Sequence, residues 1–341
     1  MSLPGQEILS YVEDNLFSDY HGENALFLNA EHSAALKNLA ARNNLTAYQP
    51  LRSYYDFLSG LDVDLTTNLR TLQNEDYRFA IVQLTKNKKE NFLHIAKAYA
   101  LLKQKGTAYI YGSNENGAQR YEKELKKLGF EVDSIFKHKS RIFWIQKTDN
   151  TAPSAFDEWL SYADMRNIEG TSLKTLPGIF SSDKIDKGSK VLTQYLPDKL
   201  KGKGGDFGCG YGYLSHYICT QDIANEITCI DYDQRALDCA TYNLTSYDDI
   251  IFEWQDILNA VMSSAQYDWI VMNPPFHQDR NMNKALGQSF IEKAAHSLKK
   301  NGTLYMVANT HLPYEDLMKK HFNTGESIDT KLGYKIFVAQ K

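Results

Sequence analysis

The chain has 341 residues, of which 43% are hydrophobic and 23% charged, as is typical of a folded globular protein with room for two domains. No apolar run approaches the roughly 18 residues that a membrane-spanning helix needs, and the acidic N-terminal segment is unlike a signal peptide. Neither the cysteines nor any His, Asp or Glu group has the spacing of metal ligands. We therefore expect a cytoplasmic protein with reduced thiols, no metal and no membrane partner. The cysteines are Cys209, Cys219, Cys229 and Cys239.

Charge is distributed unevenly along the chain. The formal net charge is only −4, but residues 86–147 carry 14 Lys or Arg against 6 Asp or Glu. Such a segment is either a set of solvated helix faces or a surface that contacts nucleic-acid phosphates. Under the second interpretation, Lys86, Lys88 and Lys89 are candidates for phosphate contacts.

Two stretches, residues 79–147 and 268–341, show the same order of predicted elements. Each reads as a strand, a helix ending in lysines, a glycine turn, a second strand, a second helix and a terminal hairpin. Alternating strands and helices predict mainly parallel sheets covered by helices on both faces. We therefore predict a duplicated α/β domain, with one copy in residues 1–147, a linker in 148–160 and the second copy in 161–341.

The two copies differ where ligands usually bind. Aligning Ile81-Val82 with Ile270-Val271 places Leu84-Thr85-Lys86 opposite Asn273-Pro274-Pro275. The glycine-rich DFGCGYG of the second copy has no close counterpart in the first, where the nearest sequence is GENALF at 22–27. The first copy is therefore expected to be degenerate: it keeps the fold and lacks the ligand site.

The sequence DFGCGYG at 206–212 predicts a nucleotide-cofactor site at a strand-to-helix turn. Glycines permit positive φ and close backbone approach, and free N–H groups at the start of a helix attract polar or anionic groups. A nicotinamide dinucleotide site requires G-x-G-x-x-G, whereas this turn reads G-x-G-x-G with an acid at its start. Because S-adenosylmethionine (SAM) has no pyrophosphate to seat, we favour SAM. The residues predicted to bind it at this turn are Asp206, Gly208, Gly210 and Gly212.

Two further acidic residues follow predicted strands downstream of the turn. Asp231 ends the strand at 226–231, where its carboxylate can accept hydrogen bonds from both ribose hydroxyls of the cofactor. Asp256 follows the next strand and is predicted to face the adenine ring. Both are therefore candidate cofactor ligands.

Asn273-Pro274-Pro275-Phe276 follows the apolar strand predicted at 268–272, at the edge where open α/β sheets bind ligands. The amino nitrogen of a base is a poor nucleophile because its lone pair is delocalised into the ring. The Asn273 side-chain oxygen and the Pro274 carbonyl can accept hydrogen bonds from both of its N–H groups, while Pro275 stiffens the loop and Phe276 stacks on the base. This motif predicts methyl transfer from SAM to an exocyclic base nitrogen, with His277 as a candidate proton acceptor.

The motifs LPGIFSSDKIDKGSKVL, DFGCGYGYLS, DWIVMNPPFH and LYMVANTHLPY resemble those of the bacterial 16S rRNA guanine-N2 methyltransferase family, over essentially the whole chain. The resemblance implies two tandem class I (Rossmann-like) methyltransferase domains, the N-terminal one degenerate and used for RNA docking or support. It implies SAM-dependent N2-methylation of guanine-1207 in 16S rRNA of the small ribosomal subunit, by a protein that we expect to be a monomer.

The resemblance carries the SAM and base-binding roles to the residues singled out above. It also implies residues that close the site or shape the base pocket, on the stretch before the cofactor turn and on a loop after the fifth strand. These are Pro177, Phe180, Ser181, Asn309, Pro313 and Tyr314.

Alternatives stay open at this point. The 23S rRNA guanine-N2 methyltransferases share NPPFH, although the LPY that follows ANTH favours the 16S type. DNA adenine and protein glutamine methyltransferases use related N-P-P-F/Y chemistry, but a duplicated half without a cofactor site argues against them. A non-catalytic ribosome-assembly factor that retains the SAM fold belongs to another class, and loss of SAM binding would support it.

Overall fold

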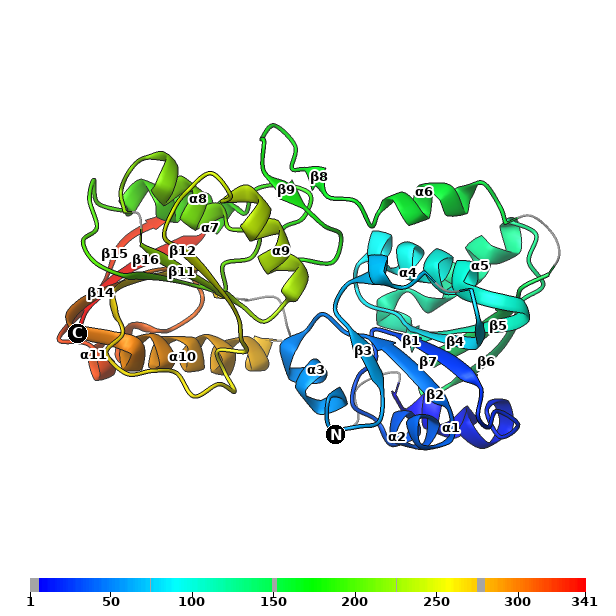
Figure 1. Ribbon diagram of the computed structural model, residues 1–341. Helices are drawn as coiled ribbons and strands as arrows, with labels where there is room; N and C mark the ends of the chain where they lie inside the picture. Colours follow the sequence, from blue (N-terminus) through cyan, green and yellow to red (C-terminus); the bar gives the residue numbers. More distant parts are fainter. Residues whose placement is uncertain (1–5, 74, 149–151, 225, 275–279) are drawn as a thin grey trace. The chain divides into compact units, whose positions relative to one another are not determined.

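The computed structural model describes residues 6–73, 75–148, 152–224, 226–274 and 280–341, and the chain divides into two compact units, Met1–Asp164 and Met165–Lys341 (Figure 1). Each unit is an α/β domain built around one seven-stranded sheet. Among the helices of the described ranges, none combines the length and the apolar character needed to cross a bilayer.

The first unit contains helices on both faces of a mainly parallel sheet. Its helices are α1 (Gln6–Leu16), α2 (Ala34–Arg42), α3 (Arg52–Leu58), α4 (Lys88–Leu101), α5 (Ala118–Lys127) and α6 (Ala155–Ser161). Its strands are β1 (Asn24–Leu28), β2 (Asn44–Tyr48), β3 (Asp64–Thr66), β4 (Tyr77–Gln83), β5 (Leu102–Ser113), β6 (Asp133–Lys137) and β7 (Ser140–Gln146). They lie in the order β3-β2-β1-β4-β5-β7-β6, and β7 alone runs in the direction opposite to the other strands.

The second unit repeats this plan. Its helices are α7 (Lys187–Leu192), α8 (Tyr213–Thr220), α9 (Gln234–Asn243), α10 (Arg280–Ser297) and α11 (Glu315–His321). Its sheet strands are β10 (Gly204–Phe207), β11 (Ile227–Asp231), β12 (Ile250–Trp254), β13 (Tyr267–Met272), β14 (Leu298–Asn309), β15 (Thr324–Lys331) and β16 (Tyr334–Gln340). A separate pair, β8 (Arg166–Asn167) and β9 (Lys174–Thr175), precedes them.

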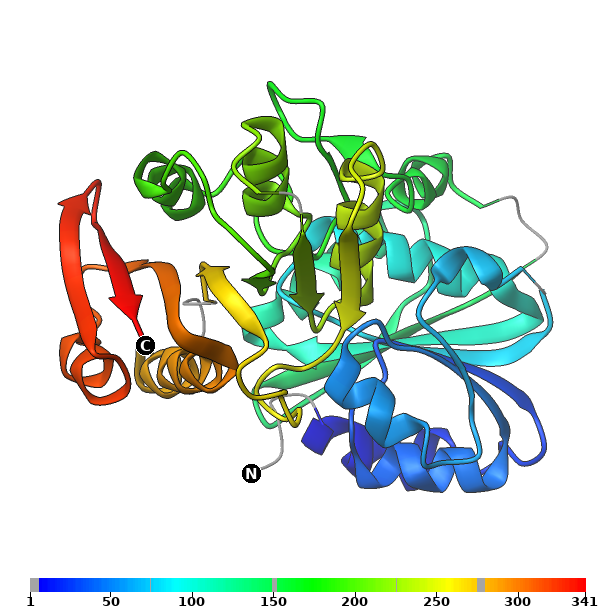
Figure 2. The same cartoon turned by 60° about the vertical axis from the view of Figure 1, so that its left-hand side comes forward.

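The order of the second sheet, β12-β11-β10-β13-β14-β16-β15, matches the first position by position. Figure 2 shows the terminal β15–β16 hairpin in red beside the orange β14. The predicted duplication of a mainly parallel α/β fold is therefore confirmed. Both sheets bury apolar residues on both faces, which is why their central strands read as continuous hydrophobic runs.

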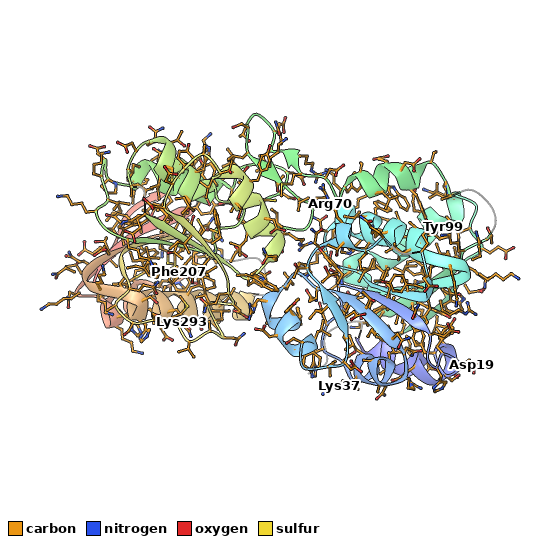
Figure 3. The ribbon with its side chains drawn as sticks, viewed as in Figure 1. Asp19, Lys37, Arg70, Tyr99, Phe207 and Lys293 are labelled. Atoms are coloured by element: carbon orange, nitrogen blue, oxygen red, sulfur yellow. The ribbon has the colours of Figure 1, made fainter. Side chains whose placement is uncertain are left out.

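Two apolar layers form the core of the second unit. Phe207, Ile270 and Met306 face α10 and α11, whereas Val271 and Ile336 face α7, α8 and α9. Figure 3 shows Phe207 inside this unit and Lys293 on α10, where the ammonium group donates a 2.6 Å hydrogen bond to the Ala260 carbonyl. The strand ends that carry the motifs are thus held on a rigid support.

Strand register corrects the predicted alignment of the two copies by one residue. In the first sheet Phe79 pairs with Thr107 after an irregularity, and in the second Trp269 pairs with Thr303 after the same irregularity. Ile81-Val82 therefore corresponds to Val271-Met272, and Gln83 corresponds to Asn273. The sequence could not fix this register because both strands are apolar on both faces.

The last six residues of the segment predicted as a linker, 155–160, form helix α6 of the first unit together with Ser161. Phe156 and Trp159 are buried there, and the Trp159 ring stacks on Phe92 of α4 with 4.3 Å between ring centroids. Apolar residues at helical spacing thus extend the first core beyond its sheet.

Candidate active site

The predicted cofactor turn connects β10 to α8. Gly208, Gly210 and Gly212 have φ of 74°, 55° and 85°, a region that residues with a Cβ rarely adopt. A Cβ on Gly212 would also lie 3.2 Å from that of Ala240, on the neighbouring helix α9. The turn therefore requires its glycines, and a Cβ on Gly210 would meet no atom of the described residues within 4 Å beyond its two neighbours in the chain.

Asp206 lies beneath this turn and is fully buried. Its Oδ2 accepts hydrogen bonds from the Ser215 N–H (3.2 Å) and hydroxyl (2.7 Å), while Oδ1 has no partner among the described residues. Burial raises the pKa of the carboxyl to about 6, against the lowering effect of both Ser215 hydrogen bonds. A buried acceptor without a partner is costly, so this oxygen is suited to a ligand that donates a hydrogen bond.

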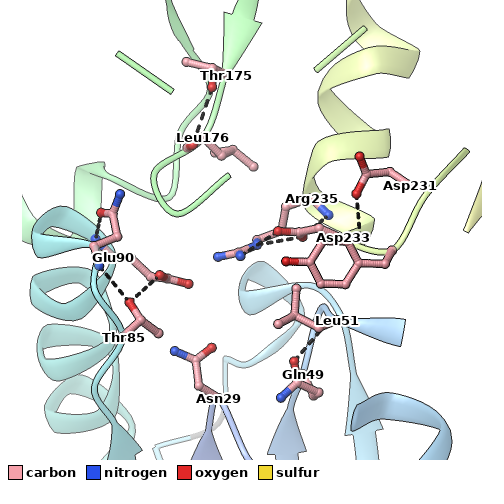
Figure 4. A network of polar contacts seen from close by, with 12 residues as sticks. Asn29, Gln49, Leu51, Thr85, Glu90, Thr175, Leu176, Asp231, Asp233 and Arg235 are labelled. Carbon is pink, nitrogen blue, oxygen red and sulfur yellow. Dashed lines mark hydrogen bonds and ion pairs between the residues drawn. The ribbon is translucent and has the colours of Figure 1, made fainter. Parts of the chain in front are cut away.

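Asp231 ends β11 and holds the glycine turn in place. Its Oδ2 accepts a 2.8 Å hydrogen bond from the Gly210 N–H, and Oδ1 accepts one of 2.9 Å from the Asp233 N–H. Asp233 in turn pairs with Arg235 at 2.7 Å (Figure 4). Burial is the main cause that raises the pKa of Asp231 to about 7, so this group also titrates near neutrality.

Asp256 follows β12 and is half-buried. Its carboxylate accepts hydrogen bonds from the Leu258 N–H (3.0 Å) and the Asn259 side chain (2.7 Å), so it stabilises the turn after the strand. Its predicted contact with the adenine ring stays a prediction.

Asn273 lies directly after β13, beside the cofactor turn, because Phe207 pairs with Met272 in the sheet. Its side-chain nitrogen donates hydrogen bonds to Asp186 Oδ1 (2.7 Å) and to the Ser189 hydroxyl (2.8 Å). Among the described residues, the side-chain oxygen has no hydrogen-bond donor and remains as an acceptor. Pro274 is buried, and the predicted residues Pro275, Phe276 and His277 lie outside the described residues.

Asp186 and Ser189 are the residues that the sequence analysis did not single out. They are 87 and 84 residues from Asn273 in sequence, so no local pattern connects them. Only their position in the Asp-Lys-Gly-Ser segment of the motif LPGIFSSDKIDKGSKVL could have indicated a role at the site.

The remaining predicted residues lie in different environments. Phe180 is 43% exposed, and Ser181 has a φ of 56° and donates a hydrogen bond to the Lys184 carbonyl. Pro177 is buried, Asn309 ends β14 half-buried, and Pro313 is exposed. Tyr314 is fully buried, packed so closely on α10 that a Cβ on Gly287 would lie 1.9 Å from its hydroxyl. Tyr314 therefore supports the loop from inside the core.

In the first unit, register places Phe27 where the second has Asp206, and Asn29, with φ of 59°, where it has Gly208. The counterpart of the glycine turn is thus residues 29–33. The earlier candidate, GENALF, was wrong because it contains strand β1 itself. A buried apolar ring has replaced the carboxylate.

Gln49 takes the place of Asp231 and is held by its own domain. It donates a 2.7 Å hydrogen bond to the Ala30 carbonyl and accepts one of 2.9 Å from the Leu51 N–H (Figure 4). Gln83, the counterpart of Asn273, accepts a hydrogen bond from the Tyr111 hydroxyl. The side chains of Gln49 and Gln83 thus form hydrogen bonds with other groups of the first unit. The strand ends of the first unit therefore do not reproduce the site of the second.

Family models match both halves of the chain. Residues 170–338 match the methyltransferase small domain, and residues 15–162 match the N-terminal domain of methyltransferase small-domain proteins. The chain belongs to the methyltransferase small-domain family. This membership confirms the predicted class of enzyme, a methyltransferase that takes its methyl group from SAM.

Individual relatives are similar in sequence to this protein over most of its length. The chain is 28% identical to the ribosomal RNA small subunit methyltransferase C of Acinetobacter baumannii over 329 residues, which cover 94% of this chain and 96% of that protein. It is 29% identical over 243 residues to the protein of the same name from Shewanella halifaxensis, covering 69% of each.

A solved structure shares the fold. The T. thermophilus 16S rRNA N2 G1207 methyltransferase (RsmC), in complex with AdoMet and guanosine, matches with a TM-score of 0.80 at 22% identity, covering 98% of this chain and 92% of that one. Both halves of the fold, including the degenerate one, are therefore shared with that protein.

Proposed function

We propose that this protein transfers a methyl group from SAM to the exocyclic N2 of a guanine in 16S rRNA of the small ribosomal subunit. The observation that carries the proposal is the fixed orientation of Asn273. Because its N–H groups are taken up by Asp186 and Ser189, its oxygen is the remaining acceptor, with no hydrogen bond to any of the described residues, beside the glycine turn.

The residues of the cofactor turn fit SAM. The turn at Gly210 has no side chain to obstruct a ligand, and Asp206 Oδ1 offers a buried acceptor below it. In this proposal Asp231, at the neighbouring strand end, accepts hydrogen bonds from the ribose hydroxyls in addition to those from the Gly210 and Asp233 N–H groups. SAM, when bound, supplies a methyl group on a sulfonium, which is an electrophile for in-line displacement.

The chain's own contribution at the base is to hold the amino nitrogen. Asn273 Oδ1 and the Pro274 carbonyl accept its two N–H groups, which draws the lone pair out of conjugation and directs it towards the cofactor turn. Preorganised acceptors stabilise the positive charge that develops on the nitrogen, and they do so most strongly where water is excluded. Phe276 as a stacking face and His277 as a proton acceptor belong to the same proposal.

The choice of substrate rests on the relatives, whose names specify small-subunit ribosomal RNA and, for the T. thermophilus protein, N2 of G1207. In this proposal the protein acts as a monomer in the cytoplasm. Its first unit contributes phosphate contacts from Lys86, Lys88 and Lys89.

Nucleoside mass spectrometry of rRNA tests the proposal. Cells that lack the gene are complemented with wild type, with Asn273→Ala, or with Asn323→Ala as a control on an exposed asparagine of the same unit. We expect N2-methylguanosine in 16S rRNA to be lost and then restored by wild type and by the control, but not by Asn273→Ala. Restoration in another RNA alone would contradict the substrate, and restoration by Asn273→Ala would contradict the role of the amide.

A further inference from the structure

The amide of Asn273 is held by two side chains from the start of helix α7. Its nitrogen lies 2.7 Å from Asp186 Oδ1 and 2.8 Å from the Ser189 hydroxyl oxygen. A carboxylate can only accept hydrogen bonds, so a flipped amide would place its oxygen against a negatively charged oxygen. The flipped orientation is therefore unfavourable, and the acceptor of Asn273 faces away from α7.

The segment Asp186-Lys187-Gly188-Ser189 is built to hold this contact. Asp186 Oδ1 also accepts a 2.8 Å hydrogen bond from the Ser189 N–H, which caps α7 and fixes the carboxylate. A Cβ on Gly188 would lie 2.9 Å from the Tyr334 ring and 3.0 Å from Asp186 Oδ1. Glycine is thus required there for α7 to approach the sheet, and both acceptors are placed by backbone geometry.

The negative charge of Asp186 also acts on another side chain near the site, that of Tyr334. Burial and then this charge raise the pKa of Tyr334, which is consistent with the Asp186 carboxylate lying near that half-buried ring. The Asp186 carboxylate polarises the amide to which it is bonded, because hydrogen bonds in series strengthen one another. The oxygen of Asn273 becomes the stronger acceptor as a result.

We infer that Asp186 and Ser189 are positioning residues for methyl transfer: they fix and polarise the Asn273 amide so that its oxygen receives the amino group of the target base. This inference rests on the proposed function. In this inference both residues act through Asn273, to which they are hydrogen-bonded.

The test compares full-length wild type with Asp186→Ala, Asp186→Asn and Ser189→Ala. Methyl transfer is measured on small subunits that lack the mark, and SAM affinity is measured separately by calorimetry. We expect Asp186→Ala to lower kcat by about 10-fold to 100-fold, with SAM affinity within about 3-fold of wild type. Ser189→Ala should lower kcat less, because one acceptor remains. Asp186→Asn should restore part of kcat, because its side-chain oxygen can accept the same hydrogen bonds but carries no charge to polarise the Asn273 amide.

Equal kcat for wild type and Asp186→Ala would overturn the inference. A parallel loss of SAM affinity and kcat that Asp186→Asn does not reverse would also overturn it, because that is the signature of a merely structural role. A double-mutant cycle in urea unfolding, between Asp186→Ala and Asn273→Ala, tests the contact without reference to activity. We expect the two substitutions to be non-additive, and additivity would refute the contact. If wild type does not methylate the small subunits while the double-mutant cycle shows coupling, the proposed function is refuted and the contact between Asp186 and Asn273 is supported.

Discussion

The buried carboxyl of Asp206 should make the stability of the ligand-free protein depend on pH. Its pKa is raised by burial from 3.8 to about 6 in the folded protein. The folded state therefore binds this proton more tightly than the unfolded state, and stability falls as pH rises from about 4 to about 6, then levels off. The whole shift corresponds to about 3 kcal/mol, of which about 1.4 kcal/mol falls between pH 5 and pH 7.5.

Urea unfolding at pH 5 and pH 7.5 measures this contribution. Between these values wild type should lose about 1.4 kcal/mol more stability than Asp206→Asn, which has no charge to bury. The pKa of Asp231 is about 7, within the same pH range, but this residue is present in both proteins. Its contribution therefore largely cancels in the comparison of wild type with Asp206→Asn. Asp248→Asn, which removes an exposed carboxylate of the same unit, should follow wild type.

The same substitution should weaken SAM binding, because the single oxygen of the amide stays with Ser215 and an N–H group faces the ligand. The reasoning would be refuted if wild type and Asp206→Asn showed the same change in stability between the two pH values. It would also be refuted if stability increased with pH through this range in wild type alone.

Four further outcomes are expected. Asn273→Ala should lower kcat by about 100-fold with unchanged SAM affinity, and a matching loss of SAM affinity in calorimetry would contradict the role of the amide. Calorimetry should give one SAM per chain, whereas two sites would mean that the first unit retains cofactor binding. Replacing the three lysines predicted to contact phosphates with glutamine should reduce the salt dependence of RNA binding by about 2 in log–log slope, and an unchanged affinity would remove that surface. Gly287→Ala should cost about 1–3 kcal/mol in urea unfolding through its clash with Tyr314, and wild-type stability would disprove that close packing.

The sequence predicted the features of this protein that are encoded locally. The glycine turn, the strands around it and the duplication all follow from short patterns, and Asp206 and Asn273 were found because each adjoins such a pattern. The partners of Asn273 were missed because a side-chain contact between distant segments leaves no periodic signal. The pairing of the two copies was off by one residue at Ile81 because a strand buried on both faces has no alternation to fix its register.

Two sheets assembled in the same strand order create a hazard while the chain folds. Parallel strands that are far apart in sequence pair slowly, and a strand of one half can then enter the sheet of the other at an equivalent position. The sequences at those positions protect against such an exchange. Phe27 fills the place of Asp206 with a ring, so exchanging β1 and β10 would press that ring against Ser215 and leave the carboxylate among the apolar residues around Phe27. The sequence difference between the two halves at the cofactor site therefore also disfavours pairing of a strand with the sheet of the other half.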